Sequence, residues 1–197
     1  MNVIHFYQIF FPTVWLAWII AWWVFATNVK ATVRRQPALS RLLNFILLWC
    51  AFGLLLWGQV IPFPRPLTDR FLPSSEWQFW AAFGAVLTLA GLLFTVWARV
   101  YLGRNWSGMA ATIKADHELI TGGPYALVRH PIYSGLMLAF VGTGLAIGQW
   151  RAVLAMALGL VAFVHRMVVE EGFMREQFGA AYDTYAKRVR AFVPGII

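Results

Sequence analysis

The amino-acid sequence predicts an all-α polytopic membrane protein with about five transmembrane helices and an amphipathic C-terminal helix. Of its 197 residues, 60% are hydrophobic and only 12% are charged, which lies far from the usual make-up of a soluble domain. Several windows hold the roughly 20 mainly apolar residues that a helix needs to cross a hydrocarbon core of about 30 Å. In addition, lysine and arginine gather in alternate connections between these windows, as is typical of membrane proteins.

Five apolar segments account for the predicted spans. In chain order they are 8–27, 42–61, 77–98, 132–149 and 152–169. Only Trp150 and Arg151 separate the last two segments, so we expect a tight hairpin. Its arms of about 18 residues suit either a full crossing or a dip into the bilayer. The first segment has no basic n-region and no small-residue cleavage site, which favours a retained helix over a signal peptide.

We expect one membrane domain over residues 1–197, built in two parts. Residues 1–98 hold three spans, and residues 99–197 hold a long loop, the hairpin and a C-terminal helix. The loop 99–131 carries too many aromatic and branched residues for a disordered linker, so we expect it to fold over the membrane surface. The tail 170–192 repeats apolar residues at spacings of three and four, which predicts an amphipathic helix.

The distribution of basic residues predicts the topology. Thirteen of the 16 lysines and arginines fall in segments that the spans place on one side of the membrane. By the positive-inside rule this side is the cytoplasm, which puts the N-terminus outside and the C-terminus inside. The net charge of +8 follows from this pattern and does not favour a nucleic-acid partner. The single cysteine, Cys50, lies in the middle of a span and is best explained as a small apolar residue.

Charged residues at the two ends of the hairpin predict a functional site. His130 and Glu170 are 40 residues apart, which two helices of about 18 to 20 residues use up in going out and back. The hairpin therefore returns Arg166, Glu170 and Glu171 to the membrane face of His130. Such a cluster suits a zwitterionic ligand, because a carboxylate seeks cationic donors and an ammonium seeks a glutamate. The alternative is that the basic residues only anchor helix ends to lipid headgroups.

The motifs around this cluster resemble a known family. "RHPIYSG" at 129–135, followed after a hydrophobic hairpin by "EE" at 170–171, is similar to the signature of integral membrane methyltransferases of the isoprenylcysteine carboxyl methyltransferase and phospholipid methyltransferase family. Further stretches agree: "LGRNWS" (102–107), "HELITGGPY" (117–125) and "FGAAYDTY" (178–185). The resemblance covers about residues 99–194. It implies a cytoplasmic cofactor-binding loop, S-adenosyl-L-methionine as the cofactor, and methyl transfer to a lipophilic acceptor.

The resemblance also implies which residues bind the cofactor. These are His117, Glu118, Leu119, Ile120 and Tyr125 on the adenosine side, and Arg129, His130, Pro131, Ile132, Tyr133 and Glu170 on the methionine side. Glu170 is expected to meet the ammonium of the methionine moiety. No GxGxxG motif follows a predicted strand, in keeping with a cofactor site that is not a Rossmann fold. We expect no metal site.

The catalytic candidates are Arg166 and Glu171. The resemblance implies that Arg166 faces the methyl acceptor. A carboxylate acceptor is already an anion at neutral pH and needs no general base, so Arg166 would orient it through paired hydrogen bonds. An amine acceptor needs a base, and the local candidates are Glu171 and His165.

Several alternatives remain at this level. Isoprenylcysteine carboxyl O-methyl transfer is the activity that the motifs resemble most, and phospholipid N-methyl and small-thiol methyl transfer are the alternatives within the family. An NADPH-dependent sterol-type reductase and a non-enzymatic membrane protein are the alternatives outside it. The expected partners are the lipid bilayer and a lipophilic or lipidated acceptor, and the oligomeric state is open. The expected location is the inner membrane of a prokaryote, with the active site on the cytoplasmic face.

Overall fold

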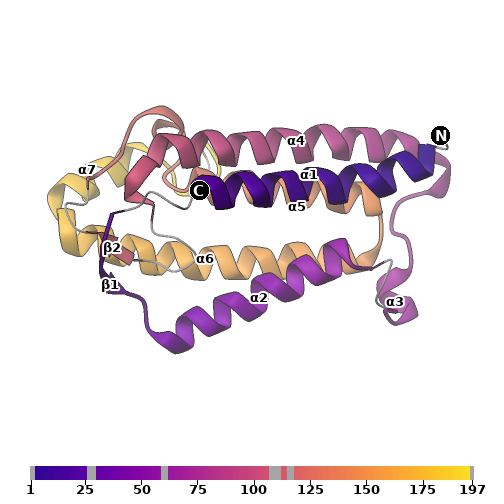
Figure 1. Cartoon of the computed structure of the whole chain (residues 1–197), viewed down its shortest axis with the longest axis horizontal. Helices are drawn as coiled ribbons and strands as arrows, with labels where there is room; N and C mark the ends of the chain where they lie inside the picture. The colour runs from indigo at the N-terminus through magenta and orange to yellow at the C-terminus, as the bar shows by residue number, and fades with distance from the viewer. Residues whose placement is uncertain (1–2, 26–29, 59–61, 107–111, 115–117, 196–197) are drawn as a thin grey trace.

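The computed structural model describes residues 3–25, 30–58, 62–106, 112–114 and 118–195. It is a helical membrane protein, as predicted (Figure 1). The α-helices are α1 (Val3–Phe25), α2 (Ala38–Leu56), α3 (Arg65–Thr68), α4 (Trp77–Leu102), α5 (Pro131–Ile147), α6 (Trp150–Phe178) and α7 (Ala180–Arg188). One feature was not predicted. The short strands β1 (Thr32–Arg35) and β2 (Thr112–Lys114) pair in antiparallel fashion and join the α1–α2 connection to the loop after α4.

Within the part of the chain that the structure describes, four helices are long and apolar enough to cross a membrane, which makes the chain an integral membrane protein. The qualifying segments are Phe6–Phe25, Ala38–Leu56, Ser74–Asn105 and Trp150–Phe178. The fourth predicted span is the exception, because α5 has only 17 residues and therefore a length of about 25 Å. It begins at Pro131 and ends at Ile147, and the left-handed backbone of the next residue, Gly148 (φ 64°), forms the tight turn into α6.

The short helix α5 lies at the centre of the bundle, against α2, α4 and α6. Its contact with α4 is a contact between backbones. A Cβ atom added to Gly91 of α4 would lie 2.4 Å from the carbonyl oxygen of Gly135, and one added to Gly84 would lie 2.2 Å from that of Gly142. Small residues allow this approach, which is how helices pack in membranes without a hydrophobic driving force between them. The glycines therefore fix the height of α5 against α4.

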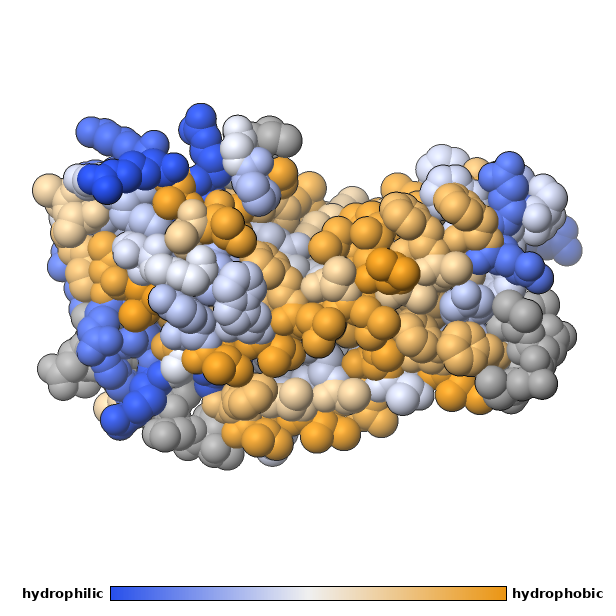
Figure 2. Space-filling view, turned by 90° about the horizontal axis from the view of Figure 1, so that it is seen from above, coloured by the Kyte–Doolittle hydropathy of each residue, from blue (hydrophilic) through white to orange (hydrophobic). Residues whose placement is uncertain are grey.

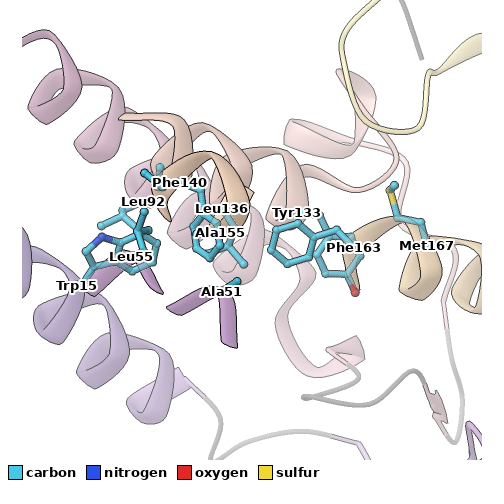
Figure 3. Packing of buried hydrophobic residues seen from close by; sticks show 12 residues of the cluster. Trp15, Ala51, Leu55, Leu92, Tyr133, Leu136, Phe140, Ala155, Phe163 and Met167 are labelled. Atoms are coloured by element: carbon cyan, nitrogen blue, oxygen red, sulfur yellow. The ribbon is translucent and has the colours of Figure 1, made fainter. Parts of the chain in front are cut away.

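A row of buried aromatic and aliphatic side chains runs along the bundle interior (Figure 3). It starts at Trp15 of α1, continues through Phe140 and Tyr133 of α5, and reaches Phe163 and Met167 of α6. The space-filling view in Figure 2 shows hydrophilic residues gathered at the two ends of the molecule and a mainly hydrophobic surface between them. The apolar row thus connects two polar ends.

The prediction of one tail helix over 170–192 is wrong in its bounds. Helix α6 continues without a break from the membrane to Phe178, and α7 is a separate helix. Gly172 weakens a helix by about 1 kcal/mol relative to alanine but does not end it. Gly179 does end it, because its backbone takes a positive φ of 49°. The chain after α7 is not helical and returns to the start of α5.

Candidate functional site

Three segments meet at the end of the bundle where α5 begins and α6 leaves the apolar interior. They are the turn before α5, the last part of α6, and α7 with the residues after it. Their charged and phenolic side chains form what we call the polar cluster: Arg129, His130, Tyr133, Arg166, Glu170 and Glu171. The cluster unites the two motifs that are 40 residues apart in sequence, as the hairpin length predicts.

Glu170 lies at the inner side of the polar cluster. Its Oε1 accepts hydrogen bonds from the Tyr133 hydroxyl at 2.7 Å and from Arg166 Nε at 3.0 Å. Its Oε2 lies 3.7 Å from His130 Nδ1. Arg166 is itself buried, with its guanidinium carbon 5.5 Å from the centre of the Tyr133 ring. A single carboxylate therefore holds one cation from its own helix and two polar groups from the start of α5.

Glu171 lies at the outer side and is shared by three basic groups. Its Oε1 accepts from Arg129 Nε at 3.0 Å and Nη2 at 2.6 Å, and lies 3.3 Å from His130 Nε2. Its Oε2 accepts from Arg175 at 3.0 Å. Both oxygens of Glu171 are thus engaged with cations.

His130 lies between the two carboxylates and has a raised pKa. Burial of the ring by itself lowers the pKa, but the hydrogen bonds and negative charges of Glu170 and Glu171 outweigh burial and raise it above the usual value. The ring stacks on Tyr133 with a centroid distance of 5.7 Å, and Tyr133 stacks on Phe163 at 5.4 Å. The charged end of the site is therefore continuous with the apolar row of the interior.

The chain after α7 packs against the turn before α5 and covers this side of the polar cluster. The backbone N–H groups of Arg129 and His130 donate to the carbonyls of Arg190 and Ala191 at 2.8 and 3.0 Å. Arg129 Nη1 also donates to the carbonyls of Ala186 and Val189. Arg129 therefore holds the tail in place as well as pairing with Glu171.

Buried tyrosines complete this wall. The Tyr185 hydroxyl on α7 donates to the backbone carbonyl of Tyr125 at 2.6 Å. Burial is the main cause that raises the pKa of Tyr185 to about 12, so its hydroxyl keeps its proton at neutral pH. Sequence reasoning did not assign Tyr185 or Tyr182 to the site. The signal was their spacing of three on one helix face, where Tyr182 lies under the Arg175 guanidinium and Tyr185 reaches the Tyr125 carbonyl.

The remaining predicted residues lie in different places. Tyr125 and Pro131 are buried, Ile132 packs against the core, and Leu119 and Ile120 are half-buried. The Glu118 side chain is 69% exposed, pairs with Lys30 of the α1–α2 connection at 3.4 Å and accepts a hydrogen bond from Asn105, so it contacts these two residues rather than the polar cluster. His117 lies outside the described residues.

His165, one of the two base candidates, faces α2 instead. Its Nδ1 lies 2.8 Å from Asn44 Oδ1, and its Nε2 lies 3.3 Å from Ser40 Oγ. Gln36 in turn donates to the same Ser40 hydroxyl at 2.9 Å. Both ring nitrogens of His165 are therefore engaged in a polar contact that ties α6 to α2.

Comparison with known proteins places this geometry in a family. The sequence profile of the phospholipid methyltransferase family matches residues 79–181, which is more than half of the chain and includes most of α4, all of α5 and α6, and the whole polar cluster. The chain belongs to the phospholipid methyltransferase family. This family member is a membrane methyltransferase, which favours methyl transfer over the reductase and non-enzymatic alternatives.

Relatives of this methyltransferase carry two kinds of name. It is 34% identical over 134 residues to a probable protein-S-isoprenylcysteine O-methyltransferase of Oryza sativa subsp. indica, covering 66% of this chain and 70% of that protein. It is 30% identical over 127 residues to protein-S-isoprenylcysteine O-methyltransferase B of Arabidopsis thaliana, covering 63% and 64%. It is also 32% identical over 170 residues to the cobalt-zinc-cadmium resistance protein CzcN of Cupriavidus metallidurans, covering 85% and 74%.

Proposed function

We propose that this protein transfers the methyl group of S-adenosyl-L-methionine to the carboxylate of a lipophilic acceptor. The observation that carries the proposal is the polar cluster, in which cationic and anionic side chains of α5 and α6 meet at the end of an apolar interior. Relatives named isoprenylcysteine O-methyltransferases support a lipidated carboxylate as the acceptor.

The donor set fits the cofactor. An amino-acid head group carries one ammonium and one carboxylate, and the cluster offers both matching charges within a short distance. His130 Nδ1 and Glu170 Oε2 lie 3.7 Å apart, so a carboxylate beside His130 and an ammonium beside Glu170 would each meet an opposite charge. The raised pKa of His130 favours the charged ring that a carboxylate needs. We propose that Arg129, Pro131, Ile132 and Tyr133 form the adjoining wall and that Glu118 to Ile120 and Tyr125 line the adenosine side.

The proposed chemistry needs alignment more than proton transfer. S-adenosyl-L-methionine, when bound, supplies a methyl group on a sulfonium sulfur. The protein must orient the acceptor in line with that carbon and exclude water. Arg166 is placed for the first task, because its guanidinium is buried next to Tyr133 and Glu170. Water would be excluded by apolar surface near the cluster, which is formed by the stacked rings of Tyr133 and Phe163 and by Phe192 of the tail, which packs on the core.

The engagement of both base candidates supports a carboxylate acceptor over an amine. Glu171 holds Arg129, His130 and Arg175, and His165 is bound to Asn44 and Ser40 of α2. A carboxylate needs neither residue as a base, whereas an amine acceptor needs one of them free. In this proposal Glu171 contributes by holding Arg129 and His130 in place.

We further propose the topology that the charge pattern predicts. The N-terminus lies outside, the C-terminus and the polar cluster lie at the cytoplasmic face, and the membrane is the inner membrane of a prokaryote. In that arrangement a water-soluble cofactor reaches the cluster from the cytoplasm and a lipophilic acceptor reaches it from the bilayer.

The test is to follow a labelled methyl group. The purified protein is incubated with S-adenosyl-L-methionine labelled at the methyl carbon and, separately, with farnesylated cysteine analogue, phosphatidylethanolamine, a small thiol and total lipid extract. Label in the farnesylated analogue or the lipid extract that is released by mild base indicates an ester and supports the proposal. Base-stable label in phosphatidylethanolamine would favour N-methyl transfer, and label in the thiol would favour S-methyl transfer. Absence of label from all four would overturn the lipophilic-acceptor proposal.

A further inference from the structure

A cavity of about 410 Å³ lies at the other end of the bundle from the polar cluster. Helices α5 and α6 run between the two, because α5 starts at the cluster and ends at Ile147, beside the cavity, where α6 begins. The walls come from α1, the end of α2, the segment before α4, the start of α4 and the α5–α6 turn. Its volume lies within the range of small-molecule sites, about 300–1,000 Å³.

Two arginines line this cavity without a carboxylate to match them. Arg151 is only 3% exposed, and it donates to the backbone carbonyls of Leu54 and Leu55 and to the side-chain oxygen of Gln149. All three partners are neutral. Arg70 lies at the exposed rim. Among the described residues neither arginine has an ion pair, and no aspartate or glutamate lines the cavity.

Hydrogen bonds to backbone carbonyls allow the Arg151 guanidinium to be buried, but they do not neutralise its full positive charge. They belong to the end of α2, where the helix dipole is negative and the last carbonyls have no partners within the helix. A dipole end offsets only about half a charge. An anion in the cavity would complete the neutralisation and would also meet Arg70.

The rest of the lining is apolar and aromatic. Phe11, Leu55 and Ile147 form one part, and Trp77, which donates its indole N–H to the carbonyl of Ala146, forms another. Trp150 and Tyr7 lie at the same end of the bundle, as is usual for aromatic residues at a membrane surface. A free inorganic anion would use the arginines but leave this apolar surface without a partner.

We propose that the cavity binds an anionic phospholipid, with the phosphate held by Arg70 and Arg151 and part of an acyl chain against the apolar lining. The two arginines complement the negative phosphate, and the position of the cavity at a membrane surface makes a lipid accessible to it. This site does not rest on the proposed methyl transfer. Its role is structural, because a lipid there contacts five of the helical segments at the end of the bundle that lacks the ion pairs of the polar cluster.

The experiment compares lipids that differ only in charge. The detergent-purified full-length chain is heated with phosphatidylglycerol, with phosphatidylcholine of the same acyl chains, or with inorganic phosphate, and its apparent Tm is recorded. Phosphatidylglycerol at about 100 times its Kd is expected to raise the Tm by about 5 °C or more, and the other two additives by much less. Native mass spectrometry should show one phosphatidylglycerol retained per chain.

Variants separate the site from a general effect of lipid. Arg70→Gln is expected to halve the Tm shift or more, while Arg65→Gln, an exposed arginine of α3 that does not line the cavity, keeps it. Ser74→Trp is expected to fill the opening of the cavity while both arginines remain, and so to reduce the Tm shift as well.

Arg151→Gln is not a clean probe, because it also removes hydrogen bonds at the end of α2. Protection by S-adenosylhomocysteine should stay unchanged in both cavity variants. Equal shifts with phosphatidylglycerol and phosphatidylcholine, a full shift with phosphate alone, or a full shift in Arg70→Gln would each overturn the proposal.

Discussion

The two ends of the α5–α6 hairpin differ in whether their basic side chains are paired with carboxylates. At the start of α5, Arg129, Arg166 and His130 are each matched to Glu170 or Glu171 within 3.7 Å. At the other end Arg151 has only neutral hydrogen-bond partners, and among the described residues neither Arg151 nor Arg70 forms an ion pair. At the first end every cation of the polar cluster therefore has a carboxylate partner within the protein. At the second end the proposed phospholipid would supply the anion.

This difference indicates where rigidity comes from at each end. Matched charges in a partly dry site fix side-chain positions, which suits a site that must hold two reactants in line. Removal of one partner then leaves a buried charge uncompensated, with a cost of about 3–5 kcal/mol. At the end with Arg70 and Arg151, a bound anion would raise the stability of the folded protein, because it binds only the folded state. The predictions that follow test this contrast, from the largest expected effect to the smallest.

Replacement of Glu170 should have the largest effect. Glu170→Gln keeps the shape but removes the charge that matches Arg166 and His130, and the structural cost is about 3–5 kcal/mol. We expect loss of protection by S-adenosylhomocysteine and a fall in methyl transfer of more than about a hundredfold, measured in the labelled assay. Glu176→Gln, an exposed residue of the same helix, is the matched control and should behave like wild type. Wild-type binding in Glu170→Gln would exclude Glu170 from the cofactor site.

The glycine contact between α4 and α5 should rank second. In Gly135→Val the new Cβ would lie 2.6 Å from the Gly91 carbonyl oxygen and 2.7 Å from Thr95 Cγ2, so α5 must move away from α4. Overpacking of this kind costs about 1–3 kcal/mol and would also displace the start of α5 that carries His130. The apparent Tm in detergent and methyl transfer should both fall.

Gly53→Ala is the control for this contact. An added Cβ at Gly53 in α2 meets nothing within 4 Å, so the variant should match or slightly exceed wild-type stability. A Gly135→Val protein as stable as wild type would mean that the hairpin height is not set by α4.

The sequence alone predicts the helices well and their roles less well. Apolar length finds every long helix, because the bilayer imposes that length. It cannot tell that α5 is a short central helix, since burial by neighbouring helices and burial by lipid select the same residues. It also misplaces the end of α6, because Gly172 and Gly179 look alike in sequence and only the backbone dihedral distinguishes a tolerated glycine from a terminating one.

For the site, spacing predicts proximity but not partners. The 40-residue interval correctly brings His130 to Glu170. The return of Arg190 and Ala191 to pair with the turn before α5 carries no side-chain signal, because it uses backbone groups. The binding of His165 to α2 is equally invisible, since nothing in the sequence fixes how α2 is rotated against α6.

A pH dependence should follow from His130. Its folded-state pKa is raised above the ordinary value of about 6.5, so the charged ring stabilises the fold fully below about pH 6.5. This contribution is lost as the pH rises through the raised pKa. The groups that face the ring are Glu170 and Glu171 of α6, Tyr133 of α5 and, through Glu171, Arg129. The apparent Tm should therefore fall as the pH rises above about 6.5, and His130→Asn should show a flatter profile there. An identical slope in both proteins would assign the pH dependence to another group.

Replacement of Arg175, the most exposed basic residue that pairs with Glu171, should have the smallest effect on stability and activity. Arg129 and Arg175 both bind Glu171, but the Arg129 side chain is 12% exposed and that of Arg175 is 51% exposed. An exposed ion pair contributes about 0–1 kcal/mol, because water already solvates both charges. Arg175→Gln should therefore change the Tm and methyl transfer only slightly, and less still at high salt. Arg129→Gln should lower both strongly, since it also frees the tail from its hydrogen bonds to Ala186 and Val189. Equal losses in the two variants would show that the count of ion pairs on Glu171, and not their burial, sets the rigidity of this end.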